Sequence, residues 1–108
     1  MENRINELLA EFGVEAEGAE RGGLVFQLTV RLVEAERELE RQAAELTEAT
    51  ASAVAVAKAG DLRTSVRGDL LAGVSDKAAA VDAALMKVAE RRTALAFVVE
   101  SVKANRAA

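Results

Sequence analysis

A seven-residue repeat in the first half of the chain places the strongest constraint on its fold. The repeat advances in alternating steps of three and four residues, and Gln42 is its one polar member. This spacing puts the side chains on one side of an α-helix, typical of helices that pack along their length. We therefore expect one long helix over residues 24–59. The repeat consists of Val25, Leu28, Leu32, Ala35, Leu39, Gln42, Leu46, Ala49, Ala53 and Val56.

A second repeat of this kind lies near the end of the chain and predicts another long helix over residues 75–106. Two long helices joined by a reversal predict an all-α antiparallel hairpin with coiled-coil-like packing. The second repeat consists of Val81, Ala84, Val88, Arg91, Leu95, Val98 and Val102. The predicted interaction seam consists of Val25, Leu28, Leu32, Leu39, Leu46, Val56, Val81, Val88, Leu95, Val98 and Val102.

Residues 1–13 have the pattern of a short helix that ends at Gly13, which favours the left-handed conformation of a helix stop. A helix of this length is unstable alone in water, so we expect it to dock on the rest of the chain. Residues 14–23 combine glycines with glutamates and predict an acidic loop. The apolar face of the short helix consists of Ile5, Leu8, Leu9 and Phe12.

Residues 60–74 hold three glycines and predict the main reversal of the chain. Two layouts fit this region. One is a tight turn at Gly60 and Asp61 followed by a single helix to the end. The other is a short helix over residues 62–72 with a second break before Ser75. The apolar spacing continues through the region without slipping, which favours the single helix.

Each long helix contains a stretch that is nearly all apolar, at residues 51–57 and 94–99. Such segments are usually buried on more than one side. Two long helices and one short helix should not cover both stretches, so we predict that two hairpins pair into a four-helix bundle. Residues 1–61 carry six basic and thirteen acidic groups, and residues 62–108 carry eight and five. These opposite charges favour contact between the two halves.

The residue types that most catalytic and metal sites require are missing. The 108 residues include no His and no Cys, which excludes Ser-His-Asp triads, Cys nucleophiles with a His base, and zinc held by imidazole or thiolate. No Pro and only 3% aromatic residues fit long helices in one domain. Most glutamates lie off the seam, as on a solvated helix face. We therefore predict no catalytic residues, no metal and no cofactor.

Charge and hydropathy give expectations about partners and location. A net charge of −4 argues against nucleic-acid binding, which depends on basic groups that neutralise phosphates. The uncharged stretch at residues 49–57 is far shorter than the roughly 20 residues of a membrane span. The start of the chain lacks the basic and apolar pattern of a signal peptide. We expect no nucleic-acid partner, no membrane span, and a cytoplasmic location or one within a virion.

Four polar side chains lie on or beside the repeats and have two interpretations. In the first, the three basic ones hold a small anionic ligand inside the bundle. In the second, half-buried polar groups fix the register of the helices and the number of partners, and this structural role is the favoured one. The four residues are Gln42, Lys87, Arg91 and Arg92.

These features predict a non-enzymatic structural or interaction protein that self-associates into a homodimer or higher oligomer, with other protein subunits as further partners. A component of a larger particle such as a phage is one form of this role. The composition is typical of small bacterial and phage proteins. One alternative is an amphipathic coat protein on a lipid or granule surface. Another is a small all-helical enzyme that binds an anionic ligand.

Overall fold

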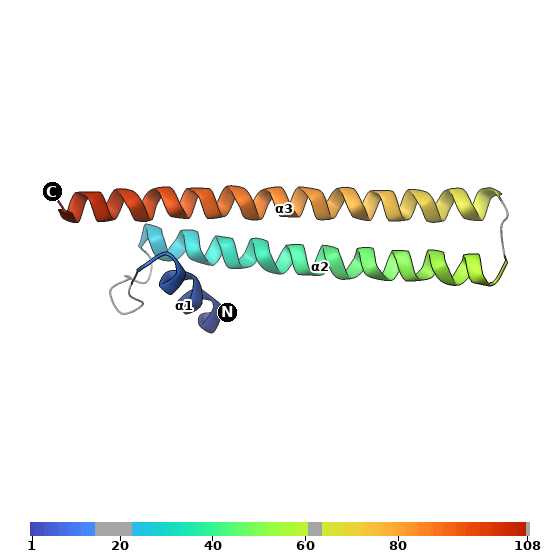
Figure 1. Ribbon diagram of the computed structural model, residues 1–108, viewed down its shortest axis with the longest axis horizontal. Helices are drawn as coiled ribbons and strands as arrows, with labels where there is room; N and C mark the ends of the chain where they lie inside the picture. The colour runs from blue at the N-terminus through green and yellow to red at the C-terminus, as the bar shows by residue number, and fades with distance from the viewer. Residues whose placement is uncertain (15–22, 61–63, 108) are drawn as a thin grey trace. The chain divides into compact units, whose positions relative to one another are not determined.

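The described part of the protein is all-α. A computed structural model describes residues 1–14, 23–60 and 64–107, and these ranges contain three helices and no strand (Figure 1). The helices are α1 (Glu2–Glu11), α2 (Leu24–Lys58) and α3 (Thr64–Ala107). The all-α prediction, with two long helices that pack against each other, is therefore confirmed. Most of the predicted acidic loop and the turn residue Asp61 lie outside the described residues.

The first helix ends in a Schellman motif, as Gly13 predicts. The Gly13 N–H donates to the Ala10 carbonyl at 3.0 Å, and the Val14 N–H donates to the Leu9 carbonyl at 2.8 Å. Gly13 has a φ of +75°, a left-handed conformation that is costly for any residue with a Cβ atom. The motif turns the chain so that Val14 packs against the buried side chains of α1.

The reversal after α2 begins at Gly60, which has a φ of +78°. From Thr64 the chain forms one unbroken helix, which excludes the second layout with its break before Ser75. The predicted start of the last helix at residue 75 is wrong, because Ser75 lies inside α3. A helical glycine such as Gly73 costs only about 0.5–1 kcal/mol relative to alanine. That cost does not break a helix with apolar seam positions on both sides of the glycine.

The chain forms two compact units. We call residues 1–37 and 87–108 the core unit, and residues 38–86 the hairpin unit. All of α1 belongs to the core unit, whereas α2 and α3 each contribute one segment to both units.

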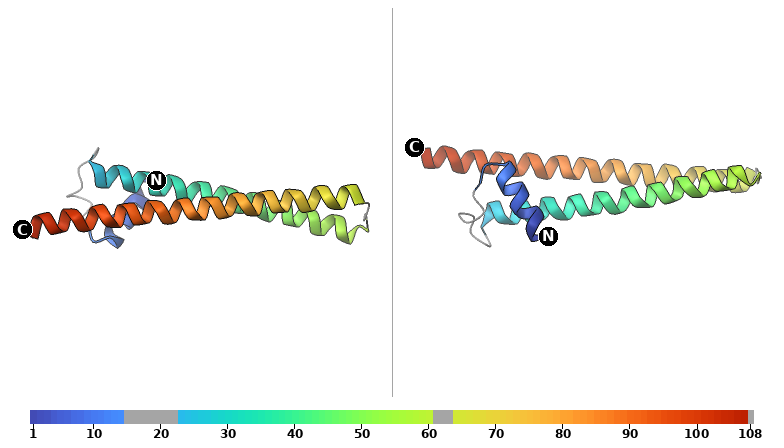
Figure 2. Two further views of the ribbon diagram at one scale, coloured as in Figure 1. Left: turned by 90° about the horizontal axis from the view of Figure 1, so that it is seen from above. Right: turned by 60° about the horizontal axis from the view of Figure 1, so that its bottom comes forward.

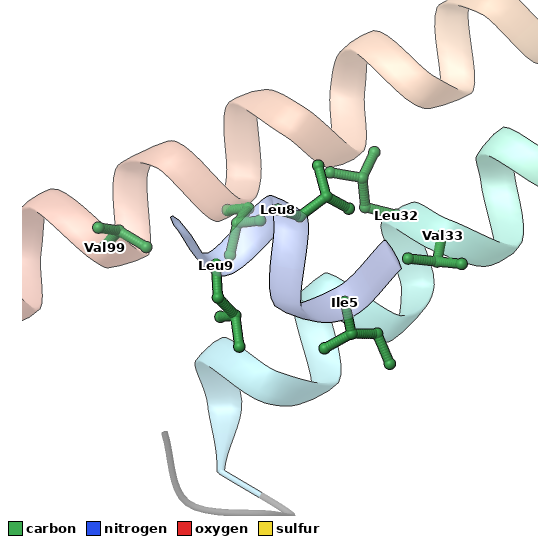
Figure 3. Close-up of a cluster of buried hydrophobic side chains, with 7 residues drawn as sticks. Ile5, Leu8, Leu9, Leu32, Val33 and Val99 are labelled. Carbon is green, nitrogen blue, oxygen red and sulfur yellow. The ribbon is translucent and has the colours of Figure 1, made fainter. Parts of the chain in front are cut away.

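In the core unit, α1 lies against the first part of α2 and the last part of α3 (Figure 2). Side chains from all three helices meet there (Figure 3). Leu8, Leu32 and Leu95 are fully buried. Burying each such side chain contributes about 1.5–3 kcal/mol. Thr29 is also buried, and its hydroxyl donates to the Val25 carbonyl at 2.8 Å. The apolar cluster consists of Ile5, Leu8, Leu9, Leu32, Val33, Leu95 and Val99.

The short helix covers part of residues 94–99, the stretch that we expected to need further helices. Leu95 and Val99 are buried in the cluster with α1 and α2. Phe97 remains exposed, with 73% of its surface accessible. The short helix covers a side of α3 that contact with α2 alone would leave open, and sequence spacing did not reveal this.

The hairpin unit consists of two antiparallel helix segments, residues 38–58 of α2 and 64–86 of α3 (Figure 1). Among its described residues, only Ala84 is buried. Two packed helices cover just one side of each other, so the apolar side chains between them stay half-buried. The buried core of the described chain therefore lies almost entirely in the core unit.

Candidate functional site

All residues of the predicted interaction seam are buried or half-buried. Within the core unit they are Val25, Leu28, Leu32, Val88, Leu95, Val98 and Val102. Within the hairpin unit they are Leu39, Leu46, Val56 and Val81. In a single chain the seam therefore serves contact between the chain's own helices. A surface for another molecule has to be sought among the residues that the seam leaves exposed.

A two-point ion pair holds the start of α1 on α2. The Arg4 Nε atom donates to Glu36 Oε1 at 2.8 Å, and Arg4 Nη2 donates to Glu36 Oε2 at 2.6 Å. Arg4 also reaches Glu7 within α1 at 3.1 Å. Guanidinium and carboxylate groups match in shape, so this pairing sets the orientation of α1 as well as adding attraction.

The end of α1 is held by two basic side chains of α3. Arg92 pairs with Glu11 and stacks on the Phe12 ring, 5.2 Å from its centroid. The Lys103 ammonium donates to the Phe12 carbonyl at 3.1 Å. A cation at this position interacts favourably with the negative end of the helix dipole. The polar contacts therefore fasten both ends of α1 around its apolar centre.

These contacts shift the pKa values of Glu36 and Arg4. The side-chain hydrogen bond from Arg4 is the main reason that the pKa of Glu36 lies below the ordinary value of 4.5, and the charges of Arg4 and Arg92 act in the same direction. Partial burial of Glu36 opposes this shift. The bonds to Glu36 and Glu7 raise the pKa of Arg4, so the pair is fully charged at neutral pH.

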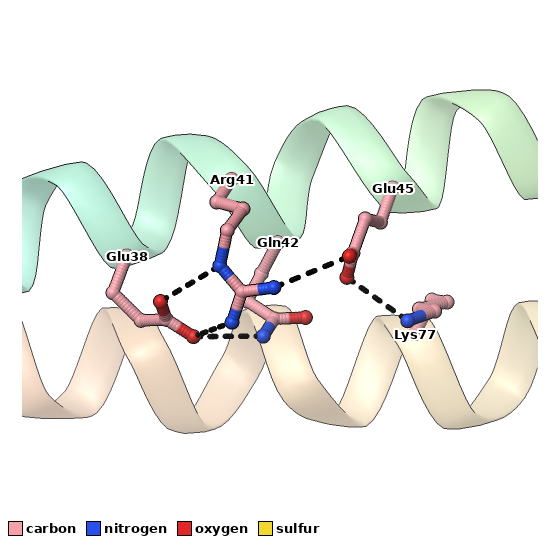
Figure 4. A network of polar contacts seen from close by, with 5 residues as sticks. All are labelled: Glu38, Arg41, Gln42, Glu45 and Lys77. Atoms are coloured by element: carbon pink, nitrogen blue, oxygen red, sulfur yellow. Dashed lines mark hydrogen bonds and ion pairs between the residues drawn. The ribbon is translucent and has the colours of Figure 1, made fainter.

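The hairpin unit carries a polar network on one side (Figure 4). Arg41 bonds both Glu38 and Glu45, three and four residues away on α2. The Gln42 amide donates to Glu38 Oε1 at 2.8 Å. Lys77 of α3 donates to Glu45 Oε2 at 2.9 Å, and this bond lowers the pKa of Glu45. The Lys77 contact links the two helices and fits a register role for the polar residues at the seam.

The four polar candidates do not share one site within the described units. Gln42 belongs to the network of the hairpin unit. In the core unit, Arg92 is engaged with α1, Arg91 is half-buried and Lys87 is exposed. A shallow depression on α3 is lined by Ala89, Glu90, Thr93, Ala94 and Phe97, so none of the three basic residues lines it.

Large apolar side chains are exposed on the hairpin unit. They are Val54, Leu71, Leu85 and Met86, with 47%, 64%, 50% and 59% of their surface accessible. Three of the four lie on α3, whose apolar residues are spread around the helix. Scattered apolar side chains are ordinary on protein surfaces, but here they belong to a unit with almost no buried core.

Two features are absent from the described residues. No group of three or more Asp or Glu residues is placed to hold a metal ion. None of the described helices has the length and apolar character that crossing a membrane requires.

No protein-family model, curated protein or solved structure gave a significant match to this chain.

Proposed function

We propose that this protein is a non-enzymatic structural or interaction protein that acts by self-association, with the hairpin unit as its assembling part. One observation carries the proposal. Ala84 is the only buried residue among those described in the hairpin unit, while Val54, Leu71, Leu85 and Met86 are about half exposed or more. A pair of helices with this pattern gains stability when further helices cover it.

The exposed area of the chain supports the same conclusion. The chain exposes 7362 Å². A compact monomer of 11.4 kDa exposes about 5,800 Å² by the usual scaling of surface with mass. The larger exposed area agrees with the half-buried apolar side chains of the hairpin unit.

The core unit complements this role because it has a buried apolar cluster of its own, although Phe97 remains exposed. Its apolar cluster is closed by α1, and ion pairs hold both ends of that helix. We infer that the core unit keeps the chain folded while the hairpin unit assembles with other copies.

The proposal is tested by the absolute mass in solution, measured by light scattering on a sizing column over a hundredfold range of protein concentration. We expect a dimer or a larger species whose population grows with concentration. A constant mass of 11.4 kDa across the whole range would contradict the proposal.

A further inference from the structure

One side of the hairpin unit is exposed along both of its helices and is free of charged residues on α2 from Ala43 to Ala57. We call this surface the bare face. Every residue in it is exposed in the single chain. The bare face consists of Ala43, Thr47, Thr50, Val54 and Ala57 on α2 and Leu71, Ala78 and Leu85 on α3.

On α2, the bare face repeats the positions that α1 covers in the core unit. Seven residues make almost two helical turns, so every seventh residue returns to nearly the same side of a helix. Glu36, which bonds Arg4 of α1, is followed at this interval by Ala43, Thr50 and Ala57. Val33, which is 1% exposed in the cluster with α1, is followed at such intervals by Glu40, Thr47 and Val54, and the bare face begins after Glu40.

On α3, the same relation holds in the opposite chain direction. Arg92 stacks on Phe12 and pairs with Glu11 of α1. Leu85, Ala78 and Leu71 precede it at successive intervals of seven residues. Both helices of the hairpin unit therefore expose the positions that receive a third helix in the core unit.

The chemistry of the bare face suits packing against helices. Ala43, Thr47 and Ala78 are small and allow another helix to approach closely, while Leu71 and Leu85 are large enough to fill the spaces between its side chains. The network of Glu38, Arg41, Glu45 and Lys77 lies outside the bare face. Two exposed carboxylates, Glu40 and Asp82, lie at its edges.

We propose that the bare face binds the bare face of a second copy of this chain, so that two hairpin units form a four-helix bundle around a two-fold axis. This inference rests on the proposed function and specifies its surface. The chain's own α1 is not free to cover the bare face, because Ile5, Leu8 and Leu9 are buried in the core unit. Two uncharged faces meet without desolvating an unpaired charge. A two-fold interface also closes on itself, which limits assembly at this surface to a dimer.

The test places carboxylates on the bare face and, in a matched control, outside it. The test variant combines Val54→Glu with Leu71→Glu. The control combines Ala55→Glu with Ala83→Glu, at exposed positions that are not part of the bare face. All four sites are exposed in the single chain, so both variants should keep the wild-type helical content in far-ultraviolet circular dichroism.

Light scattering and sedimentation then give the dissociation constant of the dimer for the wild type and both variants. We expect the bare-face variant to dissociate at least about a hundredfold more readily, because four carboxylates would be brought together without cations. The control should associate like the wild type. If the bare-face variant also associates like the wild type, the assignment of the surface is overturned while self-association stands. A wild type that stays monomeric would overturn both.

A second measurement tests the same interface without weakening the association of the two copies. The chain has no cysteine, so one introduced thiol reports on one position. Thr47→Cys lies near the middle of the bare face, and a short thiol-specific bifunctional reagent should join two copies there. The neighbouring Glu48→Cys, which is exposed outside that face, should give no more joined dimer than random collision does. Equal yields from both variants would contradict the proposed interface.

Discussion

At the scale of single residues, α1 is held by ion pairs whose partners are distant in the sequence. Arg4 and Glu36 are 32 positions apart, and Glu11 and Arg92 are 81 positions apart. Arg92 shows what this means for prediction. Its place beside the seam suggested that it binds an anionic ligand. In the folded chain, Arg92 pairs with the carboxylate of Glu11.

Local spacing explains only the pairs within one helix. Arg41 meets Glu38 and Glu45 because residues three and four apart are neighbours on a helix surface. The docking pairs of α1 depend on how segments meet in space, and no spacing rule contains that information.

The Arg4–Glu36 pair is tested by Glu36→Gln, which removes the charge while keeping the shape of the side chain. We expect the free energy of unfolding to fall by about 1 kcal/mol, because the pair is only partly buried and water screens it. Urea denaturation at a fixed protein concentration measures the change. The matched control is Glu34→Gln, at an exposed position of α2. Equal midpoints for the two variants would contradict a docking role for Glu36.

The same pair predicts a dependence of stability on pH. The pKa of Glu36 is lower in the folded chain than its ordinary value of 4.5, so the unfolded chain binds more protons in acid. The contribution of charged Glu36 to the free energy of unfolding is complete above its pKa in the unfolded chain. This contribution is lost as the pH falls through its pKa in the folded chain. The unfolding free energies of wild type and Glu36→Gln should therefore converge progressively as the pH falls below 4.5. A difference that stays constant down to pH 2 would contradict this assignment.

At the scale of elements, apolar spacing predicted which segments are helical but not where the short helix docks. The unbroken phase of the seam through Gly68 and Gly73 favoured a continuous α3, which the structure has. The four apolar residues of α1 predicted that it docks. They did not identify the docking surface, because such a pattern fits many helix surfaces. Its place on α2 and α3 depends on partners such as Val33 and Val99.

The end of α1 provides a test of the glycine conformation. Gly13→Ala should lower the free energy of unfolding by about 1–2 kcal/mol, because alanine is strained in the left-handed conformation. The new Cβ atom would also lie 2.7 Å from Lys103 Nζ and disturb its bond to the Phe12 carbonyl. Thermal and urea denaturation measure the loss.

Gly73→Ala is the matched control for this variant. A Cβ atom at Gly73 meets nothing within 4 Å, and the residue is already helical. We expect the control to raise the free energy of unfolding by about 0.5–1 kcal/mol, since alanine favours a helix. Changes of the same sign in both variants would show that the left-handed conformation of Gly13 is not what α1 requires.

At the scale of the whole molecule, the chain divides into a unit with a closed core and a unit without one. The seven-residue repeat hides this division because its spacing is the same at Leu32, which is fully buried, and at Leu46, which is half-buried. The difference comes from the third helix, which is present in one unit and absent from the other. The sequence therefore led us to expect additional helices for both apolar stretches. It did not show that α1 would serve as the additional helix in the core unit only.

The central claim is that association completes the hairpin unit while the core unit stands by itself. Amide hydrogen exchange, followed at protein concentrations below and above that of dimer formation, tests it directly. We predict that amides in residues 38–58 and 64–86 exchange faster than those of the core unit in dilute solution. Their exchange should slow at high concentration, when a partner covers them, while the core unit changes little. Equal protection of both units at every concentration would contradict the account.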